Sequence, residues 1–512
     1  MDANVDKINF AASIGIVLLV SVPLALNPIA GAALVEASYA FVATNFGWLY
    51  LLAGVAVLLL LMWLAFGRFG KVRLGAAGEG PEFSTYSWIA MLFCAGVGAG
   101  LMYWSAIEWA SYYQAPPFGV APETPEAARW ASSYGMFHWG IIAWAFYCLP
   151  TIAIAYPFYA RQVPVLKYSV ACHYWFRGRE ESAPARAMDF LFMLALIGGA
   201  GSSLGFSTPL IAALISRLTG VDTGFGLEAV VVGICVVAFA GSVFLGLEKG
   251  IKRLSDINMA LALGLLAFVF IAGPTLFIVK ASLSGVGTMV ANFVTMSTWA
   301  DPFTDSGFVE DWTVFYWAWW VAYGPFVGMF VTRISRGRTI RQVIAGMLLY
   351  GSLGGALFYM VLGNFSLALQ LSGEVDILGI MQATDGNQAI VASFDQLPLP
   401  ELAIGLFCIV SIIFSATTYD SASYTLASSA TRSLHPSEDP PRWHRTFWAF
   451  ALAILPITLM YIGGIKVAQT AVLIASLPIL LTGVLSSVAL VKVLREDHPQ
   501  SPGDGERGPS KA

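Results

Sequence analysis

The fold of this chain is decided by residues 311–341, which read DWTVFYWAWWVAYGPFVGMFVTRISRGRTIR. The stretch begins at a carboxylate, runs through about 21 mostly apolar residues and ends in a cluster of four arginines. At a rise of roughly 1.5 Å per residue, a helix of that length crosses the roughly 30 Å hydrocarbon core of a bilayer. Arginine and lysine collect at the cytoplasmic ends of membrane helices. We therefore predict a transmembrane helix whose carboxyl-terminal end faces the cytoplasm.

Four large aromatic residues of this predicted helix lie on one face, within an arc of about 100° at 3.6 residues per turn. They are Tyr316, Trp319, Trp320 and Tyr323. A single tryptophan in a membrane helix is most often a packing residue or part of the interfacial belt. Four aromatics on one face, partly at mid-span and beside a Gly-Pro pair, instead favour an aromatic cage. Such a cage attracts a quaternary ammonium group, which has no N–H to donate and is held by the π faces of the rings.

The composition places the whole chain in a membrane. Of its 512 residues, 57% are hydrophobic and 11% are charged, against about 25% charged residues in typical soluble proteins. We expect a polytopic membrane protein that is not an enzyme, needs no cofactor and binds no nucleic acid. The five cysteines are scattered, so they predict neither disulfides nor a metal site. The amino terminus lacks a basic region and a small-residue cleavage site, and is interpreted as the first span.

Twelve apolar segments are long enough to cross a bilayer. They fall near residues 9–29, 47–67, 87–109, 130–158, 187–216, 226–247, 254–279, 312–332, 342–371, 401–430, 446–463 and 468–491. An even number places both termini on one side of the membrane. With the termini inside, the inner loops carry 23 of the 27 lysines and arginines, and the outer loops carry four. This asymmetry predicts that both termini are cytoplasmic.

Helix-breaking residues lie inside three of these segments. The third contains glycines at alternate positions, the fifth a glycine-rich run followed by Pro209, and the eighth the pair Gly324-Pro325. Irregular backbone at membrane depth is tolerated where it is buried in protein or lines a cavity, as in transporters. For the fifth segment we favour close helix packing through small residues. Breaks in the third and eighth segments, five helices apart, have the offset expected of two inverted five-helix repeats.

The same stretches resemble one known family. Residues 311–342 closely resemble the eighth-helix motif of the betaine/choline/carnitine transporter (BCCT) family, and the similarity covers nearly the whole chain. The other motifs that carry it are AGVGAGLMYW (95–104), FHWGIIAWAFY (137–147), GLEKGIKRLSDINM (246–259) and TTYDSAS (417–423). The resemblance implies a multi-pass transporter of the bacterial inner membrane that works by alternating access, is surrounded by lipid and assembles as a homotrimer.

An all-α fold of the LeuT type is also implied, with two inverted five-helix repeats preceded by two helices. The limits that follow are 1–86 for the two first helices and a cytoplasmic loop, 87–280 for the first repeat, 281–311 for an outer loop, 312–494 for the second repeat, and 495–512 for a short disordered cytoplasmic tail. The outer loop contains an amphipathic stretch, which is either a helix lying on the outer surface or part of an ordinary loop.

The aromatic box of the family can be carried over position by position. Its expected wall consists of aromatic residues from the fourth and eighth segments: Trp139, Trp144, Tyr147, Trp319, Trp320 and Tyr323. Trp144 and Tyr147 are an i,i+3 pair on one helix face, and facing aromatics from two helices form a box, not a belt. Tyr323 stands where most relatives have a further tryptophan, so the resemblance does not fix the exact substrate.

Sodium-coupled members of the family bind Na⁺ through backbone carbonyls of the unwound third helix and hydroxyls of the tenth. The matching positions are Ala95 and Val97 for the carbonyls, and Thr417 and Thr418, beside Phe414, for the hydroxyls. Oxygen atoms are the ligands that a hard cation requires. Threonine hydroxyls in membrane helices also bond back to the preceding turn. Without the resemblance, that structural reading would be the favoured one.

Sodium-independent exchangers of the family carry an arginine in the seventh helix, at the position taken here by Met259. Because no cation is built in, the resemblance implies Na⁺ symport. Residues 107–119, IEWASYYQAPPFG, are more similar to the exchanger and methylamine-N-oxide branch. Exchange therefore stays open as the alternative.

The glycine-rich part of the third segment contains no acidic residue, whereas choline-carrying relatives have an aspartate there. We therefore expect a zwitterion with a methylated ammonium or sulfonium group, of the glycine betaine or dimethylsulfoniopropionate type, imported with Na⁺. The alternative is a Na⁺-independent exchanger of the carnitine or trimethylamine N-oxide type. Glu108, Asp256 and Asp420 are carboxylates within or near spans. They are interpreted as structural groups, with a proton-linked role left open for Glu108.

Overall fold

The computed structural model describes residues 28–76, 78–98, 100–179, 181–304, 306–432, 438–462 and 465–499, together with positions 6, 10, 11, 15 and 434. Regular structure in these ranges is helical, and an isolated antiparallel bridge joins Arg73 to Thr339. Most of the predicted first span (9–29), and residues 500–512 of the predicted tail, lie outside the described residues.

The first half of the chain supplies long helices and three short turns. They are α2 (Pro28–Phe66), η1 (Arg68–Lys71), α3 (Thr85–Val97), α4 (Gly100–Gln114), α5 (Pro125–His138), α6 (Ile141–Ala160), η2 (Tyr168–Cys172), α7 (His173–Phe176), α8 (Ala183–Thr219), α9 (Phe225–Leu245), η3 (Leu247–Ile251) and α10 (Lys252–Ala272).

The second half adds helices interrupted by π-helical turns. They are α11 (Thr275–Ala291), α12 (Phe293–Thr298), η4 (Val309–Val314), α13 (Phe315–Ile334), α14 (Ile340–Gly346), η5 (Met347–Gly351), α15 (Ser352–Phe358), η6 (Tyr359–Gly363), α16 (Asn364–Ser372), α17 (Ile377–Ala383), α18 (Gly386–Phe394), α19 (Pro400–Ser429), α20 (Arg442–Ile462) and α21 (Ile465–Asp497).

The all-α, multi-pass character predicted from composition is confirmed. Among the described residues, eight helical stretches are long and apolar enough to cross a membrane, or nine when the bent pair α3 and α4 counts as one span. The total of twelve stays a prediction, because most of the first predicted span lies outside the described ranges.

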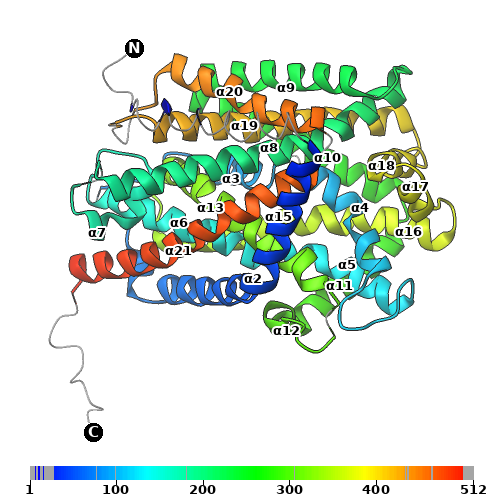
Figure 1. The fold of residues 1–512 in the computed structure, drawn as a ribbon, viewed down its shortest axis with the longest axis horizontal. Coiled ribbons are helices and arrows are strands. Elements are labelled where there is room, and N and C mark those ends of the chain that lie inside the picture. Colours follow the sequence, from blue (N-terminus) through cyan, green and yellow to red (C-terminus); the bar gives the residue numbers. More distant parts are fainter. Residues whose placement is uncertain are drawn as a thin grey trace, which may run out of the picture.

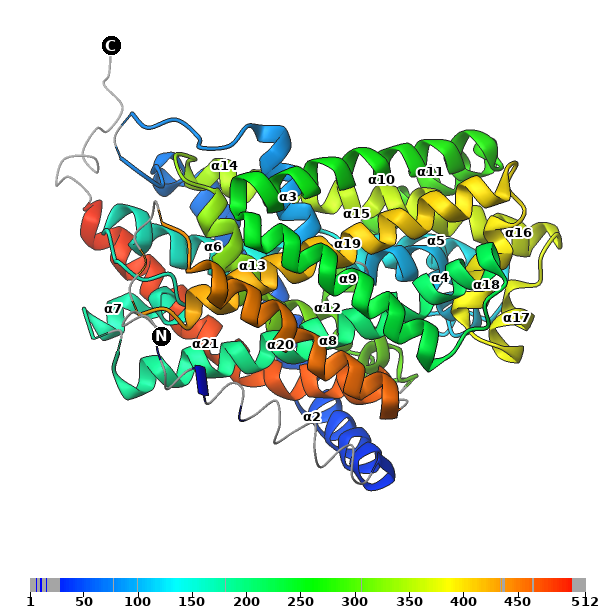
Figure 2. The ribbon, with the colours of Figure 1, turned by 90° about the horizontal axis from the view of Figure 1, so that it is seen from above.

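The long helices lie side by side along the longest axis of the molecule (Figures 1 and 2). In both views α7 lies at one end of the bundle, and α16, α17 and α18 lie at the opposite end. Helix α13 occupies the middle and packs against α2, α6, α8 and α21. All 20 of its residues are buried. The stretch 311–341 therefore contains the core helix of the bundle.

The predicted break in the third span is confirmed. Helix α3 ends at Val97, α4 begins at Gly100, and the two helices differ in direction by 61°. Gly98, between them, has φ 60° and ψ −172°. Only glycine adopts such a conformation without strain, so the glycine determines where the helix stops.

The break expected at Gly324-Pro325 is wrong, because α13 continues through both residues. A proline inside a helix removes one backbone hydrogen bond, and here it does not end the helix. A Cβ on Gly324 would lie 2.9 Å from the carbonyl oxygen of Phe146, and one on Gly328 would lie 2.9 Å from the Pro150 side chain. These small residues let α13 approach α6 closely, as in other membrane helix pairs.

The fifth predicted span forms one continuous helix, α8, which passes through its glycines and Pro209. The packing interpretation of those glycines therefore agrees with the structure. A Cβ on Gly199 would lie 2.4 Å from the ring of Tyr323, so this glycine is required for the contact between α8 and α13.

Two predicted domain limits fall inside helices. The limit at residue 280 lies within α11, and α12 follows it, so much of the predicted outer loop is helical. The limit at 494 lies within α21, which continues to Asp497. Arg161 donates hydrogen bonds to Glu496 and Asp497 at 2.8–3.0 Å. These bonds order the first residues of the range that was expected to be a disordered tail.

Two basic loops that were both predicted to lie inside are neighbours in space. The amide of Leu74 donates to the carbonyl of Arg338 at 2.8 Å. The amide of Ile340 donates to the carbonyl of Val72 at 2.9 Å. Arg333 also forms an ion pair with Glu82 at 3.2 Å. The loops after α2 and α13 therefore lie at one end of the bundle, and the side of the membrane that they face stays a prediction.

Candidate functional site

Five of the six predicted box residues form a continuous chain of ring contacts between α6 and α13. Trp320 is its centre, with ring centroids 4.8 Å from Trp139, 5.8 Å from Tyr147 and 5.7 Å from Trp319. Trp144 joins through Tyr147 at 5.5 Å. The contacts of Trp320 with Trp139 and Tyr147 are edge-to-face. Each of these side chains is at most 5% exposed.

Hydrogen bonds fix the orientation of two of the rings. The indole Nε1 of Trp320 donates to the backbone carbonyl of His138, the last residue of α5, at 2.9 Å. The hydroxyl of Tyr147 donates to the carbonyl of Gly96 at 2.9 Å, two residues before the break at Gly98. The box therefore contacts the broken end of α3 directly.

Tyr323, the sixth predicted residue, occupies a different position. Tyr323 lies one turn beyond Trp320 on α13. Its ring packs on Gly199 of α8, and its ring centroid lies 5.5 Å from that of Phe326. Tyr316, which the sequence placed on the same face but not in the expected wall, stacks on Trp320 at 5.7 Å and 18° and on Trp319 at 6.4 Å and 4°. The shared helix face was the signal that would have identified Tyr316.

Of the predicted ion ligands, Thr418 of α19 reaches the end of α3. The Thr418 hydroxyl lies 3.1 Å from the carbonyl oxygen of Cys94 and 3.0 Å from that of Phe414. The carbonyl that Thr418 reaches thus belongs to Cys94 and not to Ala95. Thr417 bonds back to the carbonyls of Ile413 at 2.9 Å and Phe414 at 3.0 Å.

These groups suit a hard monovalent cation in their chemistry. Hydroxyl and carbonyl oxygens are the ligands that such an ion prefers, and carbonyls at a helix break are not all committed to helical bonds. Val97 is the last residue of α3, and its side chain is 8% exposed. Asn258 and Thr418, whose side chains contact Cys94, are uncharged.

Two residues of α10, Ser255 and Asn258, make hydrogen bonds with Cys94 at the end of α3. The side-chain amide of Asn258 donates to the Cys94 sulfur at 3.5 Å, and this side chain is fully buried. Met259 is partly buried and packs with the hydrophobic core. The position matched to the arginine of exchangers thus lies next to a residue that contacts the end of α3. Met259 and Asn258 are both uncharged, so the argument about a missing cation is unchanged.

A buried carboxylate lies directly behind the box. Glu108 of α4 is fully buried and accepts hydrogen bonds from the hydroxyls of Tyr112, Tyr316 and Tyr359, the Tyr316 bond being 2.7 Å long. The oxygen of Tyr112 also lies 2.8 Å from His138 Nδ1. These partners come from α4, α13, η6 and α5, and only Tyr112, four residues after Glu108 on α4, is joined to the carboxylate by a short-range spacing.

The other two carboxylates have structural partners. Asp256 pairs with Lys252 at 3.1 Å and accepts a hydrogen bond from Ser87 at 3.0 Å. Asp420 is fully buried and accepts from Ser242 at 2.6 Å and from Ser421 at 3.2 Å. These contacts agree with the structural interpretation of both groups.

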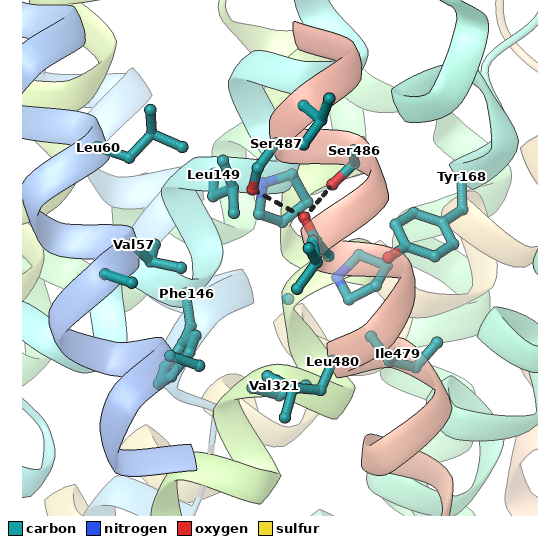
Figure 3. A pocket seen from close by; sticks show the side chains of 18 residues that line it. Val57, Leu60, Phe146, Leu149, Tyr168, Val321, Ile479, Leu480, Ser486 and Ser487 are labelled. Carbon is teal, nitrogen blue, oxygen red and sulfur yellow. Dashed lines mark hydrogen bonds between the residues drawn. The ribbon is translucent and has the colours of Figure 1, made fainter. Parts of the chain in front are cut away.

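An apolar pocket of about 240 Å³ lies on the opposite face of α6 and α13 (Figure 3). Its walls come from α2, α6, α13 and α21, and include Val57, Phe146, Val321 and Leu480. The hydroxyls of Ser486 and Ser487 in its wall are bonded to a carbonyl of their own helix. This pocket offers no charge for a zwitterion, so the box is the better candidate for the substrate site.

Comparison with known proteins agrees with the geometry. The family model described as "BCCT, betaine/carnitine/choline family transporter" matches residues 8–499. The transporter YeaV of Escherichia coli (strain K12) is 34% identical over 445 residues, covering 86% of this chain and 92% of that protein. A carnitine transporter of Acinetobacter baumannii is 34% identical over 444 residues, covering 86% of this chain and 80% of that protein.

Among solved structures, a Na⁺-coupled sialic acid symporter in an outward-open state aligns over 88% of this chain and 81% of that chain. Its TM-score is 0.44 and its sequence identity is 11%, a likeness too weak to assign an ion or a substrate here. The family model and the two transporter sequences are sufficient for the assignment: this chain belongs to the betaine/carnitine/choline family of transporters.

Proposed function

We propose that this protein is a secondary active transporter that imports a methylated ammonium or sulfonium zwitterion, of the glycine betaine or dimethylsulfoniopropionate type, together with Na⁺. The observation that carries the substrate class is the chain of buried rings centred on Trp320. A quaternary ammonium or sulfonium group has no hydrogen to donate, and π faces are the protein surface that attracts it without a hydrogen bond.

The glycines of α3 support a zwitterion over a simple cation. A Cβ on Gly96 would lie 2.7 Å from the Trp144 ring, so no side chain fits there. A Cβ on Gly100 would lie 3.8–3.9 Å from Trp104, Trp139 and Trp319, which is ordinary contact distance. The space at position 100 accepts a Cβ, yet the chain carries glycine there, which leaves the cationic head group without a direct counter-ion in the box.

The proposed coupling between the two ligands runs through the end of α3. Tyr147 of the box bonds to the carbonyl of Gly96, and Thr418 bonds to that of Cys94. A cation that binds at the Cys94 and Val97 carbonyls would fix the backbone that also orients Tyr147. Each ligand would then raise the affinity for the other by the same factor, as linkage requires.

Alternating access requires the box to open, since its rings are at most 5% exposed. At the basic end of the bundle, Arg333 of α13 pairs with Glu82 before α3 and lies 3.8 Å from Asp439 before α20. We propose that these pairs hold the cytoplasmic path closed and separate when α3 moves. The proposed homotrimer rests on the family alone, and the proposed cytoplasmic orientation of the termini rests on the distribution of lysine and arginine.

A Na⁺-independent exchanger of carnitine or trimethylamine N-oxide is the second candidate. The observation that favours it is the 34% identity with a protein named as a carnitine transporter. Carnitine carries the same trimethylammonium group, so the same box would serve both functions. The two candidates differ in what drives transport and not in what the rings recognise.

The experiment that tests the proposal is transport by the purified protein in liposomes. Labelled glycine betaine, dimethylsulfoniopropionate, carnitine and trimethylamine N-oxide are supplied outside, with and without an inward Na⁺ gradient. Uptake that requires Na⁺ supports symport. Uptake that ignores Na⁺ but rises when the liposomes are preloaded with substrate establishes exchange instead. Absence of uptake and of counterflow for all four compounds contradicts both.

A further inference from the structure

Glu108 is a buried carboxylate, and among the described residues its basic neighbour is His138. His138 Nδ1 lies 4.0 Å from Glu108 Oε1, and the Tyr112 oxygen lies between them, 2.8 Å from Nδ1. His138 Nε2 lies 3.1 Å from the Thr313 hydroxyl. With its proton on Nδ1, the imidazole donates to Tyr112 and accepts from Thr313, so a neutral ring satisfies both contacts.

The hydrogen-bond pattern fits an ionised carboxylate. An ionised carboxylate only accepts hydrogen bonds, whereas a protonated one must also donate. Three tyrosine hydroxyls converge on the two oxygens of Glu108, two of them on Oε2 and one on Oε1. Each carboxylate oxygen therefore has at least one hydroxyl donor, and an ionised Glu108 satisfies every one of these contacts.

One of the three tyrosines also belongs to the box. The ring of Tyr316 stacks on Trp320 and Trp319, and Trp139 meets it edge-on with centroids 5.9 Å apart. Its hydroxyl donates to Glu108 at 2.7 Å. A phenol that donates to a carboxylate carries more electron density in its ring. The attraction between a ring and a cation is electrostatic, and it grows with that density.

We propose that Glu108 is a specificity-determining residue of the transporter. Its negative charge, passed on through the Tyr316 hydrogen bond and acting through the low-dielectric interior, makes the box more attractive to a positive head group. The box then selects a methylated cation over a neutral group of the same size and shape. This inference rests on the proposed substrate site and adds the source of its charge selectivity.

A purely structural role would treat the three tyrosines alike, and the chain offers a matched pair to separate the two cases. Tyr316→Phe and Tyr112→Phe each remove one hydroxyl from the same carboxylate, and both rings are fully buried. The Tyr112 ring contacts Trp312 at 4.8 Å and Phe308 at 5.6 Å. The Tyr316 ring contacts the box. Only Tyr316→Phe therefore changes both the hydrogen bond and a wall of the site.

The test compares affinities for a methylated zwitterion and its carbon isostere, whose head group is uncharged. For glycine betaine the isostere is 3,3-dimethylbutanoate, in which carbon replaces the quaternary nitrogen and the carboxylate is kept. Binding to the purified full-length protein is followed by tryptophan fluorescence or calorimetry. Wild type, Glu108→Gln, Tyr316→Phe and Tyr112→Phe are compared after their folding is checked by thermal unfolding.

We expect wild type to prefer the zwitterion, and Glu108→Gln and Tyr316→Phe to lower that preference about tenfold. Tyr112→Phe should keep the preference within about twofold of wild type. If Glu108→Gln does not fold, the two tyrosine variants decide the matter alone.

Unchanged preference in Glu108→Gln or Tyr316→Phe, or equal losses in Tyr316→Phe and Tyr112→Phe, would overturn the inference while leaving the proposed transporter intact. Wild-type protein that binds neither glycine betaine nor any of the other three methylated compounds would overturn the proposed function, and this inference with it.

Discussion

Single residues differ in how far their role can be predicted from the sequence. Trp320, Trp139 and Tyr147 were predicted as neighbours, because helix spacing and the family motif both place them on facing helices, and their rings do meet. Glu108 was not linked to the box. Its partner Tyr316 lies 208 positions away, and contact between them depends on how α4 docks on α13. Spacing along one helix carries no information on such a contact.

Truncation of Trp320 should weaken substrate binding more than any other single change in the box, because its ring contacts three of the other predicted members. We expect Trp320→Ala to lower the affinity at least about tenfold, and Trp320→Phe to keep part of it. Equilibrium binding to purified protein measures this. Trp48→Ala on α2, where the side chain is 56% exposed, is the control, and an equal loss there would argue against the cage.

Thr418 should matter more for Na⁺ than its neighbour Thr417. The Thr418 hydroxyl reaches the Cys94 carbonyl across the helix contact, whereas the backbone carbonyls that the Thr417 hydroxyl bonds to belong to its own helix. Thr418→Ala should raise the Na⁺ concentration for half-maximal uptake several-fold, and Thr418→Ser should restore it because the hydroxyl is retained. Uptake titrated with Na⁺ in liposomes tests this. A larger effect of Thr417→Ala would move the ion site along α19.

Among the helices, glycine has two structural roles, as a helix breaker and as a packing surface, and the sequence alone did not distinguish them. Glycines break the third span but act as packing surfaces in α8 and α13. In α3 the backbone at Gly98 adopts φ 60°, which ends the helix. In α13, Gly324 and Gly328 are four residues apart and face α6. The four-residue spacing was the available signal for packing, and the adjacent proline obscured it.

Addition of a methyl group at this helix contact should destabilise the protein. In Gly328→Ala the new Cβ would lie 2.9 Å from the Thr151 amide nitrogen, a backbone atom that cannot easily move. We expect a loss of about 1–3 kcal/mol in the free energy of unfolding. Thermal or denaturant unfolding in detergent measures it. Gly264→Ala on α10 is the matched control, because no atom lies within 4 Å of the added carbon, and it should be neutral or slightly stabilising.

In the whole molecule, the distribution of basic residues predicted which loops lie together, and hydropathy did not. The loops after α2 and α13, both placed inside by their basic residues, pair through backbone hydrogen bonds. Arg217 and Arg129, placed outside, belong to helix ends away from that pairing, and Arg217 pairs with Asp395 beyond α18. Hydropathy alone joined the end of α10 and the start of α11 in one predicted span, 254–279, and ended the last span at 491, whereas α21 continues to Asp497.

The proposed cytoplasmic closure can be tested with a native reporter. Cys94 lies at the end of α3 and is fully buried. In a background where the other four cysteines are replaced by alanine, Arg333→Gln should speed the modification of Cys94 by a membrane-impermeant maleimide applied from the cytoplasmic side. The reason is that the variant loses its pairing with Glu82 and Asp439. Arg129→Gln, which removes an exposed ion pair with Glu126, is the control. Equal rates in both variants would show that Arg333 does not hold the path closed.

The short distance between two carbonyls has an evolutionary consequence. Gly96 and Cys94, two residues apart on α3, accept hydrogen bonds from Tyr147 and Thr418 respectively. A descendant of this protein that changed its driving ion would have to alter the same few backbone atoms on which its substrate selection depends. Mutations that change the driving ion and mutations that change the substrate should therefore fall on the same residues. Lineages should be seen to acquire both changes together more often than either change alone.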